Sequence, residues 1–257
     1  MTEPRAATDP DPTAALDEVL AGEPAVWLAN CCAAAADPVV VRRAFPAMGR
    51  RLGRGPLRPD ADPADVHAWT VDDAGRARLL RAAATGTAGQ GRGALLALLD
   101  QLYAHGDAAE RRGVLRALDV LPIDEEGLPL LRDALRTNDV RLVAAAAGGR
   151  YAARVLPDAD LDQATLKCLF VGVPLAGVAA LPARAGPQLA RMVADFARER
   201  VAAGRSVPAD VWLVLERHPG AVDAAELPRE LSSPDPPRRG AAERFFASRR
   251  ASAAEEA

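Results

Sequence analysis

Hydrophobic residues recur at intervals of three and four over most of the chain, which is the spacing of one face of an α-helix. Between 92 and 104 these positions are Leu95, Leu98, Leu99 and Leu102. The same spacing returns over 114–121, 128–135, 140–147 and 189–196. No run alternates apolar and polar residues long enough to predict a sheet. The pattern therefore predicts an all-α protein.

Start and stop signals divide this pattern into short helices. Asp107 precedes one helical pattern and has Glu110 three positions later, which is the signature of a capping box. Pro122 ends that helix, and Asp160 is expected to cap a later one. Pro208 suits the first turn of one more helix. Short helices joined by tight turns favour antiparallel neighbours.

Two of these units begin about 30 residues apart, a spacing within the range of helical repeats. They open at Asp107 and at Asp139. We therefore expect HEAT-like stacked helix pairs, an α-solenoid type of helical repeat, with the N-terminal helices packed on one end.

The distribution of glycine and proline predicts the remaining organisation of the chain. The expected parts are a disordered N-terminus over 1–12, N-terminal helices over 13–48, a Gly/Pro/Arg-rich loop over 49–69, a helical-repeat body over 70–231, and a linker with a C-terminal tail over 232–257. Prolines mark the linker over 232–240, and the aromatic pair Phe245 and Phe246 in the tail is expected to dock on the body or on a partner.

Composition and charge exclude several classes of protein. The 257 residues include 32 Lys and Arg against 35 Asp and Glu, so the net charge of −3 argues against a generally basic nucleic-acid binder. No stretch reaches the roughly 18 apolar residues of a membrane-spanning helix, and the N-terminus lacks the features of a secretory signal. The expected location is cytoplasmic, with peripheral contact at the inner membrane left open. The excess of alanine and arginine suggests a bacterial genome rich in G and C.

No metal or cofactor motif is present in the sequence. His67, His105 and His218 share no ligand spacing, and Cys31 and Cys32 are adjacent rather than spaced as zinc ligands. The glycines over 86–93 lack the Lys-Ser/Thr that follows in a phosphate-binding loop. We therefore expect neither a metal nor a cofactor.

One segment is unusual because it contains 16 consecutive uncharged residues, from Cys168 to Ala183. Gly172, Pro174, Gly177 and Pro182 interrupt it, so a helix is expected to end near Val171 and an apolar turn to follow. The backbone polar groups of a buried turn need partners. The turn forms either the floor of a pocket or an inter-helix turn that closes the core.

Charged residues flank this segment on both sides. Lys167, the only lysine of the chain, is able to bind a carboxylate or phosphate or to form a Schiff base, or it extends to the surface as an ordinary solvated side chain. Downstream, Arg191, Asp195 and Glu199 share one helix face, on which Arg191 and Asp195 are spaced to pair. This face is either solvated or a polar wall opposite the turn, and acid–base chemistry on it would require a buried carboxyl group.

Several of these blocks resemble the EboA-domain family. Lys167–Leu175 is similar to the family's Lys-x-Leu-Phe-Val-Gly-Val-Pro-Leu core, and the stretches 184–192, 195–205 and 106–118 resemble its other blocks. The resemblance covers residues between about 95 and 215. Two positions differ, because Gly186 stands where the family pattern has Asn and Phe196 where it has Tyr.

The resemblance implies a role in bacterial metabolite traffic. Gene clusters of this kind move a natural-product precursor toward the envelope, alongside a prenyltransferase-like membrane protein and sugar-phosphate-type enzymes. The resemblance to this family implies no established catalytic activity.

Our first hypothesis is thus a non-enzymatic binding or adaptor protein that holds a small molecule or a partner protein. The residues expected to carry the binding are Lys167, Phe170, Gly172, Pro174, Arg184, Arg191, Asp195, Glu199 and Arg200. One alternative is an isomerase- or lyase-like enzyme that uses Lys167 with Asp195 or Glu199. The other is a structural scaffold for protein interactions.

Overall fold

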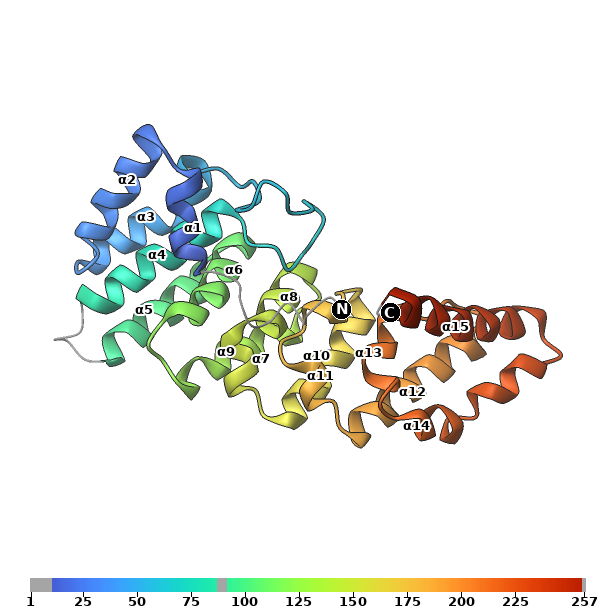
Figure 1. Cartoon of the computed structure of the whole chain (residues 1–257). Helices are drawn as coiled ribbons and strands as arrows, with labels where there is room; N and C mark the ends of the chain where they lie inside the picture. The colour runs from blue at the N-terminus through green and yellow to red at the C-terminus, as the bar shows by residue number, and fades with distance from the viewer. Residues whose placement is uncertain (1–10, 87–91, 256–257) are drawn as a thin grey trace. The chain divides into compact units, whose positions relative to one another are not determined.

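The computed structural model describes residues 11–86 and 92–255, and all of their regular structure is helical (Figure 1). One isolated bridge, between Pro56 and Thr70, is the only β pairing in these ranges. The all-α prediction is confirmed. The described chain divides into two compact units, and the boundary in the sequence lies between Leu156 and Pro157, within the expected helical-repeat body over 70–231. Of the N-terminus expected to be disordered, only Asp11 and Pro12 belong to the described residues, and Pro12 already opens a helix.

The N-terminal unit, which ends at Leu156, contains nine helices in its described part. They are α1 (Pro12–Val19), α2 (Gly22–Ala33), α3 (Pro38–Arg51), α4 (Val71–Gly86), α5 (Arg92–His105), α6 (Ala108–Ala117), α7 (Leu128–Arg136), α8 (Val140–Gly148) and α9 (Arg150–Val155). Short 3₁₀ turns at Leu118–Val120 and Glu125–Gly127 connect α6 to α7.

Aspartates begin several of these helices, as the sequence predicts. Asp107 and Glu110 form the expected capping box at the start of α6. Asp139 accepts hydrogen bonds from two backbone N–H groups at the start of α8. The expected cap at Asp160 is wrong, because the helix there begins two residues earlier, at Asp158, and Asp160 lies within its first turn. An acid in the first turn still interacts favourably with the helix dipole.

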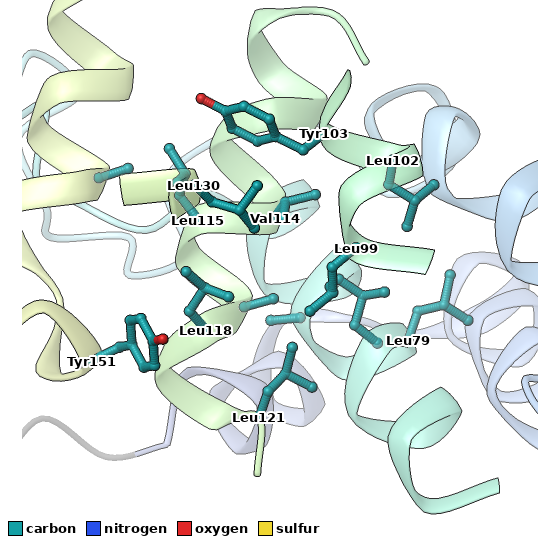
Figure 2. Packing of buried hydrophobic residues seen from close by; sticks show 14 of the residues in the cluster. Leu79, Leu99, Leu102, Tyr103, Val114, Leu115, Leu118, Leu121, Leu130 and Tyr151 are labelled. Carbon is teal, nitrogen blue, oxygen red and sulfur yellow. The ribbon is translucent and has the colours of Figure 1, made fainter. Parts of the chain in front are cut away.

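Leucine side chains fill the core of the N-terminal unit. The four leucines of the 92–104 pattern are all buried in α5. Figure 2 shows Leu99 and Leu102 on the side of Leu79 of α4, and the same cluster includes Val114 of α6 and Leu118 of the 3₁₀ turn that follows α6. The spacing of three and four in the sequence therefore identified the buried face correctly.

A cluster of buried charges joins α4 to α6, and the sequence analysis did not predict it. Arg76 lies between the two helices with its Nη1 atom 2.6 Å from Asp72 Oδ2 and 3.8 Å from Asp73 Oδ1. Arg112 Nε lies 2.8 Å from Asp73 Oδ2. Gly113 makes room for the cluster, because a Cβ atom there would lie 2.4 Å from Arg76 Cδ. Buried ions require such pairing, since an isolated buried charge is very costly.

A third buried arginine fixes the loop that precedes α4. Arg116 donates hydrogen bonds to the backbone carbonyls of Val66, His67 and Ala68, and its guanidinium lies 5.3 Å from the centre of the Trp69 ring. Three consecutive backbone carbonyls of the loop over 52–70 therefore have a hydrogen-bond partner on α6, although the loop has almost no regular structure.

The C-terminal unit begins at Pro157 and contains six helices among its described residues. They are α10 (Asp158–Val171), α11 (Leu181–Arg184), α12 (Pro187–Ala202), α13 (Trp212–Leu215), α14 (Pro219–Ala224) and α15 (Pro236–Glu255). Three 3₁₀ turns accompany them, at Leu175–Gly177, Ala209–Val211 and Leu227–Ser232. Pro208 precedes one of these turns, and the α-helix after it begins only at Trp212.

The end of the chain differs from the expected linker and short tail. Helix α15 begins at Pro236, inside the proline-rich run, because proline is well tolerated in the first turn of a helix. Phe245 of α15 is buried and stacks on Trp212, with ring centres 4.6 Å apart. Trp212 Nε1 also donates a hydrogen bond to Ser248 Oγ at 3.0 Å. The aromatic residue of the tail therefore docks on the C-terminal unit itself.

Candidate functional site

The predicted end of helix α10 and the apolar turn after it are confirmed. Gly172 follows Val171 with φ of +80°, a left-handed conformation that glycine adopts without strain. The backbone N–H groups of Gly172 and Val173 both donate to the carbonyl of Cys168. Leu175 and Leu181 of the turn are buried, whereas Pro174 is exposed.

Asp210 supplies a hydrogen-bond partner that this buried turn requires. Its Oδ2 atom accepts a hydrogen bond from the backbone N–H of Leu175 at 2.6 Å. Burial raises the pKa of the Cys168 thiol to about 12, and the negative charge of Asp210 adds to this effect. Cys168 is therefore an apolar core residue and not a nucleophile at neutral pH. Nothing in the local sequence indicated Asp210, which lies 35 residues from its partner.

Phe170 is the most exposed large hydrophobic side chain in the described part of the chain, with 67% of its surface accessible. It meets Phe196 of α12 edge-on, with ring centres 5.2 Å apart and an angle of 87° between the rings. The guanidinium of Arg200 lies 5.6 Å from the centre of the Phe196 ring. We call Phe170, Phe196 and Arg200 the aromatic–arginine patch. Lys167 lies three residues before Phe170 on α10 and is half-buried.

The acidic residues of α12 do not form a buried acid–base pair. Asp195 and Glu199 are both exposed, and Asp195 pairs with Arg198 at 3.6 Å instead of with Arg191 as predicted. Acid–base catalysis on this face would require a buried carboxyl group, and neither carboxylate meets that condition. Arg184 is engaged elsewhere, since its Nε and Nη2 atoms both donate to Asp158 Oδ1.

A surface cavity of about 270 Å³ lies beside the first turns of α12, at a distance along the helix from the patch. Its lining residues are Pro187, Arg191, His218, Gly220, Ala221 and Ala224. None of them belongs to the apolar segment from Cys168 to Ala183, so this segment does not form the floor of this cavity. Arg191 and Arg200 are nine residues apart, so about 14 Å of helix separates the cavity from the patch.

His218, which shares no ligand spacing with the other histidines of the sequence, is held in place at this cavity. It directly precedes α14, and its Nε2 atom lies 3.0 Å from the backbone carbonyl of Ala185. Because a carbonyl oxygen only accepts hydrogen bonds, Nε2 is the protonated nitrogen and donates. The structure therefore does not bring the nine predicted residues together at one site. Phe170 and Arg200 belong to the patch, and Arg191 lies at the cavity. Asp195 and Glu199 lie on the exposed face of α12, and Lys167, Gly172, Pro174 and Arg184 belong to none of these groups.

The described residues contain neither a metal-binding cluster nor a membrane-spanning helix. Within 11–86 and 92–255, no group of three or more His, Cys, Asp or Glu side chains is placed to hold a metal ion. No helix in these ranges is both long and apolar enough to cross a membrane.

Comparison with known proteins identifies one related family. Residues 32–216 match the family described as "Metabolite traffic protein EboA". The match includes all nine predicted site residues and the buried charge cluster, but not α1 or α15. Neither the curated proteins nor the solved structures contain a match to this chain.

Proposed function

Because the chain belongs to the EboA family of metabolite traffic proteins, we propose that it is a non-enzymatic binding or adaptor protein in bacterial metabolite traffic. Its cargo would be a natural-product precursor moved toward the envelope. Its partners would be proteins of the same gene cluster, including a prenyltransferase-like membrane protein. It would work in the cytoplasm or at the inner face of the inner membrane.

The observation that carries this proposal is the exposure of Phe170 within the aromatic–arginine patch. Aromatic residues and arginine are enriched at protein interfaces, where a few of them contribute most of the binding energy. Phe170 is held by an edge-on contact with a nearly buried ring, so its position is defined before any partner binds. Binding then costs little side-chain ordering.

The proposed architecture suits this role. HEAT-like helix pairs within each unit would present an extended surface for binding, as helical repeats do. The enzymatic alternative, with Lys167 acting together with Asp195 or Glu199, lacks a buried carboxyl group. A purely structural scaffold would bind through other exposed helix faces and would not depend on Phe170.

The test is affinity purification of the tagged protein from its native host, followed by mass spectrometry of co-purifying proteins and small molecules. We compare the unchanged protein with Phe170→Ala, Lys167→Ala and the control Leu231→Ala, which removes another exposed apolar side chain of the same unit. Truncation of an aromatic residue central to an interface costs about 2 kcal/mol or more, which corresponds to roughly a 30-fold loss of affinity.

We expect a stoichiometric partner that is lost with Phe170→Ala, weakened with Lys167→Ala and retained with Leu231→Ala, while circular dichroism shows unchanged helicity. Equal capture by the unchanged protein and Phe170→Ala would overturn the role of the patch. Turnover of a co-purified small molecule that Lys167→Ala abolishes would favour the enzymatic alternative.

A further inference from the structure

The cavity at the start of α12 combines an apolar lining with two nitrogen-bearing side chains. Pro187, Ala221 and Ala224 supply apolar surface, and Gly220 leaves space because a Cβ atom there would meet nothing within 4 Å. Ligand sites are typically concave and mostly apolar, with a few polar groups that orient the ligand. A volume of about 270 Å³ suits a small molecule or one end of a larger one.

Arg191 is the cationic group of this cavity, and its guanidinium forms no hydrogen bond or ion pair with the described residues. Its neighbours on α12 differ in this respect, because Arg198 pairs with Asp195 and Arg200 donates to the carbonyl of Ser206. No carboxylate lines the cavity. Arg191 therefore keeps its donors available beside an apolar surface, the arrangement in which a planar guanidinium binds an anionic group through two parallel hydrogen bonds.

His218 adds a second polar group whose orientation is already set. Its Nε2–H bond to the Ala185 carbonyl holds the imidazole, and Nδ1 remains as the second polar atom of the ring. A ring positioned in this way loses little freedom when a ligand binds.

We propose that this cavity binds the phosphate or carboxylate group of a small molecule, with Arg191 contacting the anion and the apolar lining contacting the attached body. The inference deepens the proposed function, on which it rests, since it identifies a small anionic metabolite as cargo. It concerns a cavity about 14 Å along α12 from the aromatic–arginine patch, so each of the two is tested separately.

Three probes of similar size distinguish the chemistry of the ligand: phenyl phosphate, benzoate and the neutral phenol. Their affinities for the purified full-length protein are measured by isothermal titration calorimetry at low and at moderate salt. We expect binding of phenyl phosphate or benzoate, or of both, that weakens as salt increases and exceeds the binding of phenol at least tenfold. Tighter binding of one of the two anions shows whether the cavity prefers a phosphate or a carboxylate group.

Two variants disrupt the cavity in different ways, and a third variant serves as the control. Arg191→Ala removes the charge, and Gly220→Leu fills the cavity without changing any charge; each is expected to weaken anion binding at least tenfold. Arg198→Ala removes an arginine of the same helix that is already paired and lies outside the cavity, and it is expected to leave the affinity within twofold. Circular dichroism verifies that all three variants keep their helicity.

The inference is overturned if none of the probes binds, if phenol binds as tightly as the anions, or if Arg191→Ala and Arg198→Ala have equal effects. If anion binding fails in this way but Phe170→Ala still loses the co-purifying partner, the proposed function remains supported and only the cavity proposal is wrong. If the anions bind as expected but Phe170→Ala captures the partner as well as the unchanged protein does, the role of the patch is wrong and the cavity proposal is supported.

Discussion

Replacing Arg76 with methionine tests whether the buried charge cluster holds α4 and α6 together. Arg76 is only 1% exposed, pairs with Asp72 at 2.6 Å, and donates a hydrogen bond to the carbonyl of Phe45 at 3.3 Å. Methionine fills a similar volume but leaves Asp72 with the hydroxyl of Thr70 as its remaining side-chain partner in the described structure. A buried carboxylate would thus lose its counter-ion.

The structure supplies a matched surface pair in the same unit. Arg136 and Asp133 also share one helix and are also separated by 2.6 Å, but Arg136 is 74% exposed. Removing one partner of a buried pair costs about 3–5 kcal/mol, whereas an exposed pair contributes about 0.2–1 kcal/mol. Burial alone therefore predicts a difference of several kcal/mol between Arg76→Met and Arg136→Met.

Urea unfolding followed by circular dichroism measures both free energies of unfolding. The free energy of unfolding is expected to fall by about 2 kcal/mol per molar urea. Arg76→Met should then lower the urea concentration at the unfolding midpoint by roughly 2 M, and Arg136→Met should lower it by less than about 0.5 M. Hydrogen exchange should accelerate in α4 and α6 and not in α12. The double variant Asp72→Asn/Arg76→Met should regain part of the loss, because no unpaired charge remains. Equal costs for the two single variants would refute the reasoning.

Three further predictions concern local packing. Gly113→Ala should destabilise the protein by about 1–3 kcal/mol in thermal unfolding, because its Cβ atom would clash with Arg76, whereas Gly93→Ala meets open space and should be neutral or stabilising; equal effects would contradict the clash. Native Cys168 should react with iodoacetamide at pH 8 at least ~1000-fold more slowly than in urea, since its pKa near 12 leaves almost no thiolate, and rapid native labelling would disprove its burial. Asp210→Ala should cost about 1–3 kcal/mol and accelerate hydrogen exchange over 172–178, while Asp210→Asn, which keeps an acceptor oxygen, should cost less.

The sequence alone determined the features that depend on neighbouring residues. Apolar positions at intervals of three and four identified the buried face of α5, and the Asp107–Glu110 pair located the start of α6. The end of α10 at Gly172 was equally predictable, because its left-handed backbone conformation and the apolar run after it are local properties. Resemblance over a few short blocks also identified the family.

Only the tertiary structure decided which distant polar groups meet. Asp210 reaches Leu175 across 35 residues, and Arg116 reaches the carbonyls of the loop about 50 residues earlier. Helical periodicity carries no information on such pairs, because it reports which face of a helix is buried but not what lies opposite. The cavity at Arg191 and His218 arises in the same way, from the packing of α12 beside α14. Whether an arginine is buried with a partner or left available for a ligand is therefore decided by packing between helices.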